Sequence, residues 1–169
     1  LKDKGALHAI SKLNATQIFS ESNFSTYNYS LNQFTALHFN TENQFLKEKK
    51  VRQALAQALN KQELIMEGEK RVDSLGLTDR SAEPLFKFDP ESAKKTLDEI
   101  NLNKSEPVSL NLLTLNIEPL TLTDAIKRQM ENIGVKIEVL WVCSADFYDY
   151  VIQKRYDLLL IRHNLGYTR

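Results

Sequence analysis

Three β-strand patterns follow one another in the second half of the chain: VSLNLLTL at residues 108–115, VKIEVLWV at 135–142 and YDLLLIR at 156–162. The second alternates apolar and polar residues, as a strand with one covered face does. The third is so apolar that we expect both of its faces to be covered, which is typical of a parallel sheet flanked by helices. These stretches predict a layered α/β structure.

Two helices are expected between these strands. Residues 122–133 carry apolar side chains at helical spacing and stop before Gly134, and residues 145–154 carry Phe147, Tyr148 and Val151 on one side. The order strand–helix–strand–helix–strand predicts two successive right-handed βαβ crossovers. The expected N-caps are Thr121 or Thr123 for the first helix and Ser144 for the second.

The first half of the chain continues the alternation of strand and helix. Residues 34–40 alternate like a half-buried strand, and residues 48–59 repeat apolar residues at three- and four-residue spacing. Asn60 and Glu63 form a capping-box pattern for a second helix, which we expect to end near Gly68. A further helix is expected to open at Asp89-Pro90.

These elements predict one α/β domain over residues 1–169, with a mixed sheet flanked by helices. A weaker helical pattern covers residues 1–20, and residues 69–87 are expected to form a loop. The chain opens at Leu1 without a methionine and stops at Arg169 just after a strand, so we expect it to be one lobe of a longer protein.

Composition and charge exclude several classes of protein. Lys and Arg number 22 and balance 22 Asp and Glu, so the basic excess typical of a nucleic-acid binder is missing. No apolar run approaches the roughly 20 residues that span a bilayer, and we expect no direct membrane insertion. Since Cys143 is the only cysteine, no disulfide can form within the chain.

Residues that could support catalysis or hold a cofactor do not form a recognisable motif. Phosphate-binding loops, zinc-protease motifs and nucleophile elbows are missing from the sequence. Asp146 and Asp149 share one helix face, where they suit a helix N-terminus. His38 is expected to lie on a strand face beside a local partner. We therefore expect no enzyme activity, no cofactor and no metal site.

Several motifs resemble the family 5 extracellular solute-binding proteins. They are Leu37-His38-Phe39-Asn40, Lys50-Val51-Arg52-Gln53-Ala54-Leu55, Ala58-Leu59-Asn60-Lys61, Phe88-Asp89-Pro90-Glu91 and Tyr156-Asp157-Leu158. Their order and spacing match the family over residues 30–167. The resemblance implies the second lobe of a periplasmic-binding-protein type II-like fold, in which two lobes close on a solute by a hinge.

The resemblance also suggests where a solute would be held. Many peptide-binding members follow the last strand with Trp-x-x-Asp-Tyr, whose Asp pairs with the peptide ammonium. Here those positions fall on His163, Gly166 and Tyr167, so the carboxylate is missing. Because ligands of open α/β sheets meet the carboxyl ends of the strands, the expected ligand-binding residues are His163, Asn164 and Tyr167.

By this resemblance the chain is the substrate-binding component of an ABC-type importer, located in the periplasm or outside the cell. Its expected partners are a peptide or peptide-like small solute and the membrane permease, with no nucleic acid. The alternative is the ligand-sensing domain of a transcriptional regulator with the same fold. We also expect Trp141 to lie on a buried strand, so its fluorescence should change little when a solute binds.

Overall fold

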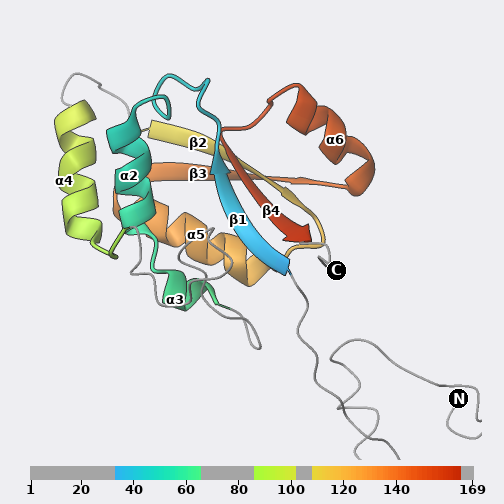
Figure 1. The fold of residues 1–169 in the computed structure, drawn as a ribbon, viewed down its shortest axis with the longest axis horizontal. Helices are drawn as coiled ribbons and strands as arrows, with labels where there is room; N and C mark the ends of the chain where they lie inside the picture. The colour runs from blue at the N-terminus through green and yellow to red at the C-terminus, as the bar shows by residue number, and fades with distance from the viewer. Residues whose placement is uncertain (1–32, 66–85, 102–107, 165–169) are drawn as a thin grey trace, which may run out of the picture. The chain divides into compact units, whose positions relative to one another are not determined.

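A four-stranded mixed sheet forms the centre of the molecule (Figure 1). The computed structural model describes residues 33–65, 86–101 and 108–164, which all belong to one compact unit. The strands lie in the order β1-β4-β2-β3; β1 is antiparallel to β4, while β2 is parallel to both β3 and β4. Their bounds are β1 Gln33–Phe39, β2 Val108–Leu115, β3 Val135–Val142 and β4 Leu158–Asn164. The predicted α/β class with a mixed sheet is confirmed.

Helices cover both faces of the sheet, but unequally. In Figure 1, α2, α4 and α5 lie together on one side, and α6 lies apart from them. None of the helices in the described part of the chain is long and apolar enough to cross a membrane. The helices are α2 Lys49–Ala58, α3 Lys61–Leu64, α4 Pro90–Asn101, α5 Leu120–Asn132 and α6 Ser144–Ile152.

The two crossovers run in opposite directions along the sheet. The chain passes from β2 to its neighbour β3 through α5, then returns past β2 to β4 through α6. Crossovers of the same hand that run in opposite directions must place their helices on opposite faces. The structure meets this requirement, since Ile126 of α5 joins the large core and Phe147 of α6 packs against the small one.

The large core lies under α2, α4 and α5, on what we call the first face of the sheet. It brings together Leu46, Leu55, Leu97, Leu112 and Leu158, each at most 1% exposed. The second face carries a small core of Leu113, Val142 and Leu159 beneath α6. Leu158, Leu159 and Leu160 are all buried, as expected for a strand covered on both sides.

Some element ends differ from the sequence-based expectations. Helix α5 begins at Leu120, so Thr121 and Thr123 lie inside it, and the Thr123 hydroxyl donates to the Leu120 carbonyl at 2.9 Å. The N-cap position of α6 is Cys143, not Ser144. Strand β4 runs two residues later than predicted because it pairs with β1 as far as Asn164.

Trp141 does not lie on a buried strand. It is 36% exposed, because β3 is an edge strand of the sheet. Alternation correctly places its side chain on the first face, together with Val135, Ile137 and Val139. However, alternation does not tell an edge strand from a central one. The expectation of a solvent-shielded indole was wrong.

The sequence motifs at Asn40 and Asp157 meet in space. The Asn40 side-chain amide donates to the Tyr156 carbonyl at 2.8 Å, and the Asn40 backbone N–H donates to the Asp157 carbonyl at 2.8 Å. The Asp157 carboxylate accepts from the Asn111 N–H at 2.8 Å and from the Asn43 amide at 2.7 Å. These residues join the end of β1 to β2 and β4, so their role is structural.

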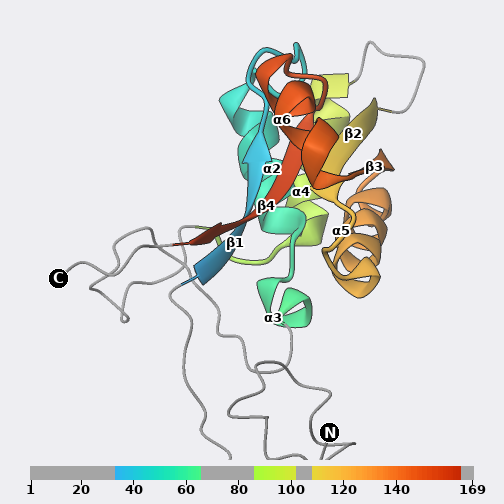
Figure 2. The ribbon, with the colours of Figure 1, turned by 90° about the vertical axis from the view of Figure 1, so that its right-hand side faces the viewer.

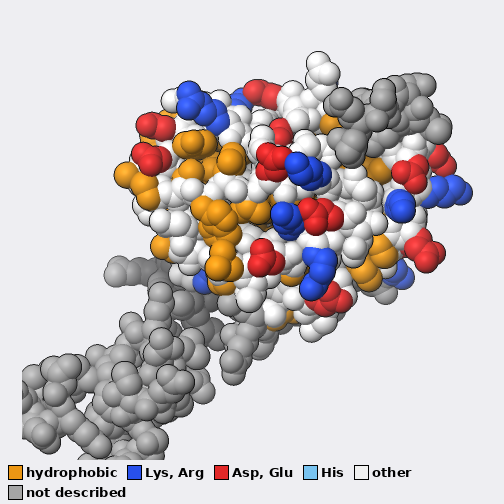
Figure 3. All heavy atoms as spheres, turned by 180° about the vertical axis from the view of Figure 1, so that it is seen from behind, with side chains coloured by type: hydrophobic (Ala, Val, Ile, Leu, Met, Phe, Trp, Pro, Cys, Tyr) orange, Lys and Arg blue, Asp and Glu red, His pale blue; other side chains and the backbone are white. Residues whose placement is uncertain are grey.

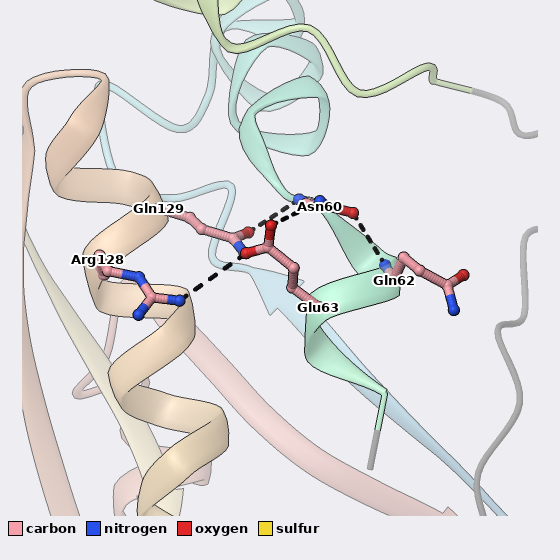
Figure 4. A network of polar contacts seen from close by, with 5 residues as sticks. All are labelled: Asn60, Gln62, Glu63, Arg128 and Gln129. Carbon is pink, nitrogen blue, oxygen red and sulfur yellow. Dashed lines mark hydrogen bonds and ion pairs between the residues drawn. The ribbon is translucent and has the colours of Figure 1, made fainter. Parts of the chain in front are cut away.

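The start of α3 is fastened to α5 by a polar network (Figure 4). The Asn60 carboxamide oxygen accepts from the Gln62 N–H at 3.1 Å, which confirms Asn60 as an N-cap. Glu63 departs from the expected capping box, because it accepts from the Asn60 side chain at 3.0 Å and from Gln129 at 3.1 Å. The Asn60 backbone N–H donates instead to the Gln129 side-chain amide oxygen, Oε1, at 2.9 Å.

Helix α3 is shorter than expected. It ends at Leu64, and Ile65 is already extended, so the prediction that Ile65 continues the helix was wrong. The helix has no fully buried side chain to hold a longer run in place. The expected stop at Gly68, the helical pattern of residues 1–20 and most of the 69–87 loop lie outside the described residues.

Candidate functional site

The candidate site lies at the edge of the sheet where β2, β3 and β4 end. Parallel strands place their carboxyl ends on the same side, and open α/β sheets bind ligands there. His163 and Asn164 are the last two residues of β4 and lie at this edge, as predicted. Tyr167 lies outside the described residues.

Strands β1 and β4 form a two-stranded ribbon that extends beyond the rest of the sheet (Figure 2). Strand β4 pairs with β2 only from Leu158 to Leu160, whereas it pairs with β1 along its whole length. The ribbon therefore presents His163 and Asn164 beside the start of β1, where Phe34 and Gln33 are their direct partners.

Three rings form an aromatic row on the second face of this ribbon: Phe34, His163 and His38. The Phe34 and His163 rings stack with their centroids 4.9 Å apart at 19°. The His38 ring meets His163 edge-on, with centroids 5.1 Å apart at 69°. Ala36 occupies the position between Phe34 and His38 on this face of β1, and its small side chain leaves room for the two histidines to approach.

The two histidines share a hydrogen bond. Their Nε2 atoms lie 2.9 Å apart, so one ring donates and the other accepts. Partial burial lowers the pKa of His38, and the neighbouring His163 lowers it further. Both effects favour neutral imidazole, which offers a lone pair to a ligand or a metal ion.

The opposite face of the ribbon carries an ion pair. Arg162 Nη2 lies 3.4 Å from Glu118 Oε2, and the Glu118 residue is 8% exposed. Glu118 belongs to the connection between β2 and α5, so this contact joins that connection to the end of β4. Thr114, near the end of β2, has a buried hydroxyl oxygen without a hydrogen-bond partner.

Apolar side chains are exposed at the same edge. Ile117 is 74% exposed and Leu120 65% exposed, both in or next to the β2–α5 connection, and Trp141 lies near the end of β3. Seen from behind, the molecule gathers hydrophobic side chains on one side and intersperses acidic and basic ones over the rest (Figure 3). The edge thus combines exposed apolar surface with the aromatic row and polar groups, as ligand sites do.

The other candidate residues are not assembled into a catalytic site. Cys143 is exposed, and its sulfur lies 3.1 Å from an Asp146 carboxylate oxygen rather than near a histidine. Tyr150 and Tyr156 pack against the small core, while Tyr148 is 69% exposed. Among the described residues, no group of three or more His, Cys, Asp or Glu side chains could hold a metal ion.

Sequence reasoning missed the pairing of His38 with His163. The expected partner of His38 was local, but the observed one is 125 residues away. Alternation placed His38 on a strand, and His163 was expected directly after the apolar strand at 156–162, yet only the antiparallel β1–β4 register brings them onto one face. No signal within either strand could have revealed this contact.

Comparisons with known proteins agree with the motifs in the sequence. The family model described as bacterial extracellular solute-binding proteins, family 5 Middle, matches residues 1–169. A comparison with curated proteins found no match.

Solved structures with the same fold come from several bacteria. The ABC transporter substrate-binding protein CtaP from Listeria monocytogenes superposes with a TM-score of 0.70 at 23% identity, over 82% of this chain and 31% of its own. NikZ from Campylobacter jejuni, in complex with Ni(L-His), gives 0.67 at 23% identity over 82% and 31%. A dipeptide-binding protein from Pseudoalteromonas sp. SM9913, in complex with Met-Leu, gives 0.66 at 23% identity over 78% and 28%. The chain thus spans about a third of the length of these proteins, all of which share its periplasmic-binding-protein type II-like fold.

Proposed function

Given that the chain belongs to the family 5 bacterial extracellular solute-binding proteins, we propose that it forms one lobe of a two-lobed protein that captures a peptide-like solute for an ABC-type importer. The single domain predicted over residues 1–169 would be that lobe. Its partners would be the solute and the membrane permease, at the cell envelope in the periplasm or outside the cell. Capture is reversible and non-covalent, so the protein makes and breaks no bonds.

The projecting end of the β1–β4 ribbon is the observation that carries this proposal. His163 and Asn164 end β4 at the carboxyl edge of the sheet, and the exposed Ile117 and Leu120 lie in or next to the connection that follows β2 at the same edge. A solute lying against this edge would meet a flat imidazole, already fixed in plane by Phe34, and an exposed carboxamide. A pre-oriented ring loses little conformational entropy on binding, which favours its use as a stacking surface.

The peptide terminus is not expected to dominate recognition. Gly166 stands where many peptide-binding members carry the carboxylate that pairs with the ammonium group. We therefore propose that His163, Asn164 and Tyr167 contact the solute through stacking and hydrogen bonds. The dipeptide and peptide complexes among the similar structures support a peptide-like solute, although others hold metal chelates. The similar structures named above give no support to the transcriptional-regulator alternative.

Calorimetric titration of the full-length protein with a peptide library tests this function. We expect a peptide to bind. Replacing His163 with Ala should raise the Kd for that peptide at least about tenfold, a loss of about 1.4 kcal/mol in binding free energy. Asn164→Ala should raise the Kd for the same peptide by a smaller factor. Lys136→Gln is the matched control, because Lys136 is exposed on β3 away from the ribbon, and its Kd should not change.

A second titration tests the role of the missing carboxylate. A peptide with an acetylated N-terminus should bind about as tightly as the same peptide with a free amine. The proposal fails if no peptide binds, or if His163→Ala and Asn164→Ala both leave the Kd unchanged. A strong preference for the free amine would refute the proposed mode of recognition.

A further inference from the structure

We propose that the edge strand β3 pairs antiparallel with β3 of a second copy of this chain, so that two four-stranded sheets join into one continuous sheet. In the described part of the chain, β3 pairs only with β2, and its other side is open to a further strand. The contact does not depend on solute capture, because His163 and Asn164 end β4, which β2 separates from β3.

The direction of the backbone groups shows what β3 offers to a second strand. The Asn116 N–H donates to the Val142 carbonyl at 3.0 Å, so the carbonyl of Val142 faces β2. Hydrogen-bonding groups alternate in direction along a strand. Val135, Ile137 and Val139 therefore turn their N–H and C=O groups away from β2, toward the open edge. Such a row of backbone groups is a template for pairing with another chain.

The charged side chains of β3 select one register for this pairing. Lys136 and Glu138 are exposed on the second face of the sheet. When Ile137 lies opposite Ile137 of the second copy, Lys136 of each copy lies opposite Glu138 of the other. These are non-hydrogen-bonded positions, where opposite side chains come closest and opposite charges stabilise the pair.

The neighbouring registers are unfavourable. A shift of two residues in one direction places Glu138 opposite Glu138, and a shift in the other direction places Lys136 opposite Lys136. Like charges directly opposite each other destabilise a strand pair. Lys136 alone would keep other strands away from this edge, as lysines on edge strands commonly do. Glu138 makes the edge complementary to itself in a single register.

Helix α5 adds to the balance of charge at this edge. The pKa of Lys136 is raised chiefly by its hydrogen bond to Glu138 and further by Glu131, and the pKa of Glu138 is lowered chiefly by Lys136 and further by Lys127. Lys127 and Glu131 also form an ion pair on α5, with Nζ and Oε1 3.9 Å apart. The charges of these four residues sum to zero, so two identical edges can meet without net repulsion.

The contact belongs to the weak and transient class. A single pair of strands buries less surface than a stable dimer needs. In the separate chain Lys136 already pairs with Glu138 at 2.7 Å, so association exchanges two ion pairs within chains for two between them. The charges therefore determine the register of the contact more than its affinity. Melting curves at low protein concentration report the single chain.

Sedimentation equilibrium of the full-length protein from about 10 µM to about 1 mM tests the contact. The unaltered protein should form dimers and nothing larger, because each copy uses its open β3 edge. Lys136→Glu and Glu138→Lys should each raise the dimer Kd at least about tenfold, because each places like charges opposite one another. Lys94→Glu reverses an exposed charge on α4, outside β3, and should leave the dimer Kd unchanged.

Combining the two charge reversals tests the register itself. An equimolar mixture of Lys136→Glu and Glu138→Lys should dimerise, because one variant then offers two acidic side chains to two basic ones on the other. The double variant Lys136→Glu/Glu138→Lys should dimerise as the unaltered protein does. If the mixture and the double variant both stay monomeric, the proposed register is wrong.

A measurement on the unaltered protein covers the case in which a variant does not fold. The backbone N–H groups of Val135, Ile137 and Val139 should exchange with deuterium more slowly at high protein concentration than at low concentration. Those of Lys136 and Glu138 face β2 and should not change. The proposal is overturned if the protein stays monomeric at about 1 mM. It is also overturned if both single variants fold and dimerise as tightly as the unaltered protein, or if exchange along β3 does not depend on concentration.

Discussion

The two faces of the sheet differ in how they are covered. Among the described residues, the first face contributes to a core of eighteen buried residues under α2, α4 and α5, whereas the core on the second face has three buried residues under α6. The uncovered part of the second face carries the aromatic row of Phe34, His163 and His38. One face therefore supplies most of the stability, and the other has room for chemistry that a close-packed core would exclude.

The largest effects are expected from substitutions at two neighbouring residues of β2, each of which removes side-chain volume from a different core. Leu112 and Leu113 are both 0% exposed but point into the large and the small core respectively. Leu112→Ala should lower the free energy of unfolding by about 3–5 kcal/mol, and Leu113→Ala by about 2–3 kcal/mol, because the small core can collapse around the cavity. Urea unfolding of both variants measures the difference. Equal losses would show that the two cores are equally rigid.

A smaller effect is expected at the polar network that completes the first face. Asn60→Ala removes the N-cap of α3 and the hydrogen bond to Glu63, so it should lower the free energy of unfolding by about 1 kcal/mol. Gln62→Ala keeps the backbone N–H that Asn60 caps, and its exposed side chain points away from the network in Figure 4. It should therefore change stability by less than about 0.5 kcal/mol. If the two variants have the same melting temperature, the Asn60 cap does not contribute to the stability of the protein.

Lowering the pH should destabilise the protein through His38, which lies on the second face. Its pKa is lowered from 6.5 in the folded protein, so protons bind more readily to the unfolded chain. The stabilisation is present above pH 6.5 and is lost as the pH falls through the depressed folded pKa. The melting temperature should drop between pH 7.5 and pH 5, and it should drop less in His38→Gln. An identical drop in both proteins would contradict this assignment.

The smallest effect is expected at the exposed ion pair on the second face. Lys136 Nζ lies 2.7 Å from Glu138 Oε1, and their side chains are 60% and 53% exposed. Lys136 has a raised pKa and Glu138 a lowered one, chiefly through their mutual hydrogen bond. Solvent and salt screen such pairs, so Lys136→Gln should leave the melting temperature unchanged at physiological salt. A clear loss of stability would show that this open part of the face matters more than its burial indicates.

The sequence predicted the strands of the sheet better than the ends of its helices. β2 and β3 occupy residues 108–115 and 135–142 as expected, because five alternating residues open each strand and a mostly apolar run completes it. Helix starts depend on single residues: Pro119 took the N-cap position where a threonine was expected, and Cys143 took it from Ser144. Two of the three expected site residues, His163 and Asn164, lie at the carboxyl end of β4, where the sequence predicted them, and Tyr167 lies outside the described residues.

Local periodicity was enough to establish the α/β class, the strands and the parallel crossovers, because these depend on residues close together in the chain. Tertiary structure alone placed β4 between β1 and β2, left Trp141 on an edge strand and brought His38 to His163. Each of these features depends on which strands become neighbours. That choice is made when residues far apart in sequence bury their apolar faces together, and no single segment of the sequence contains it.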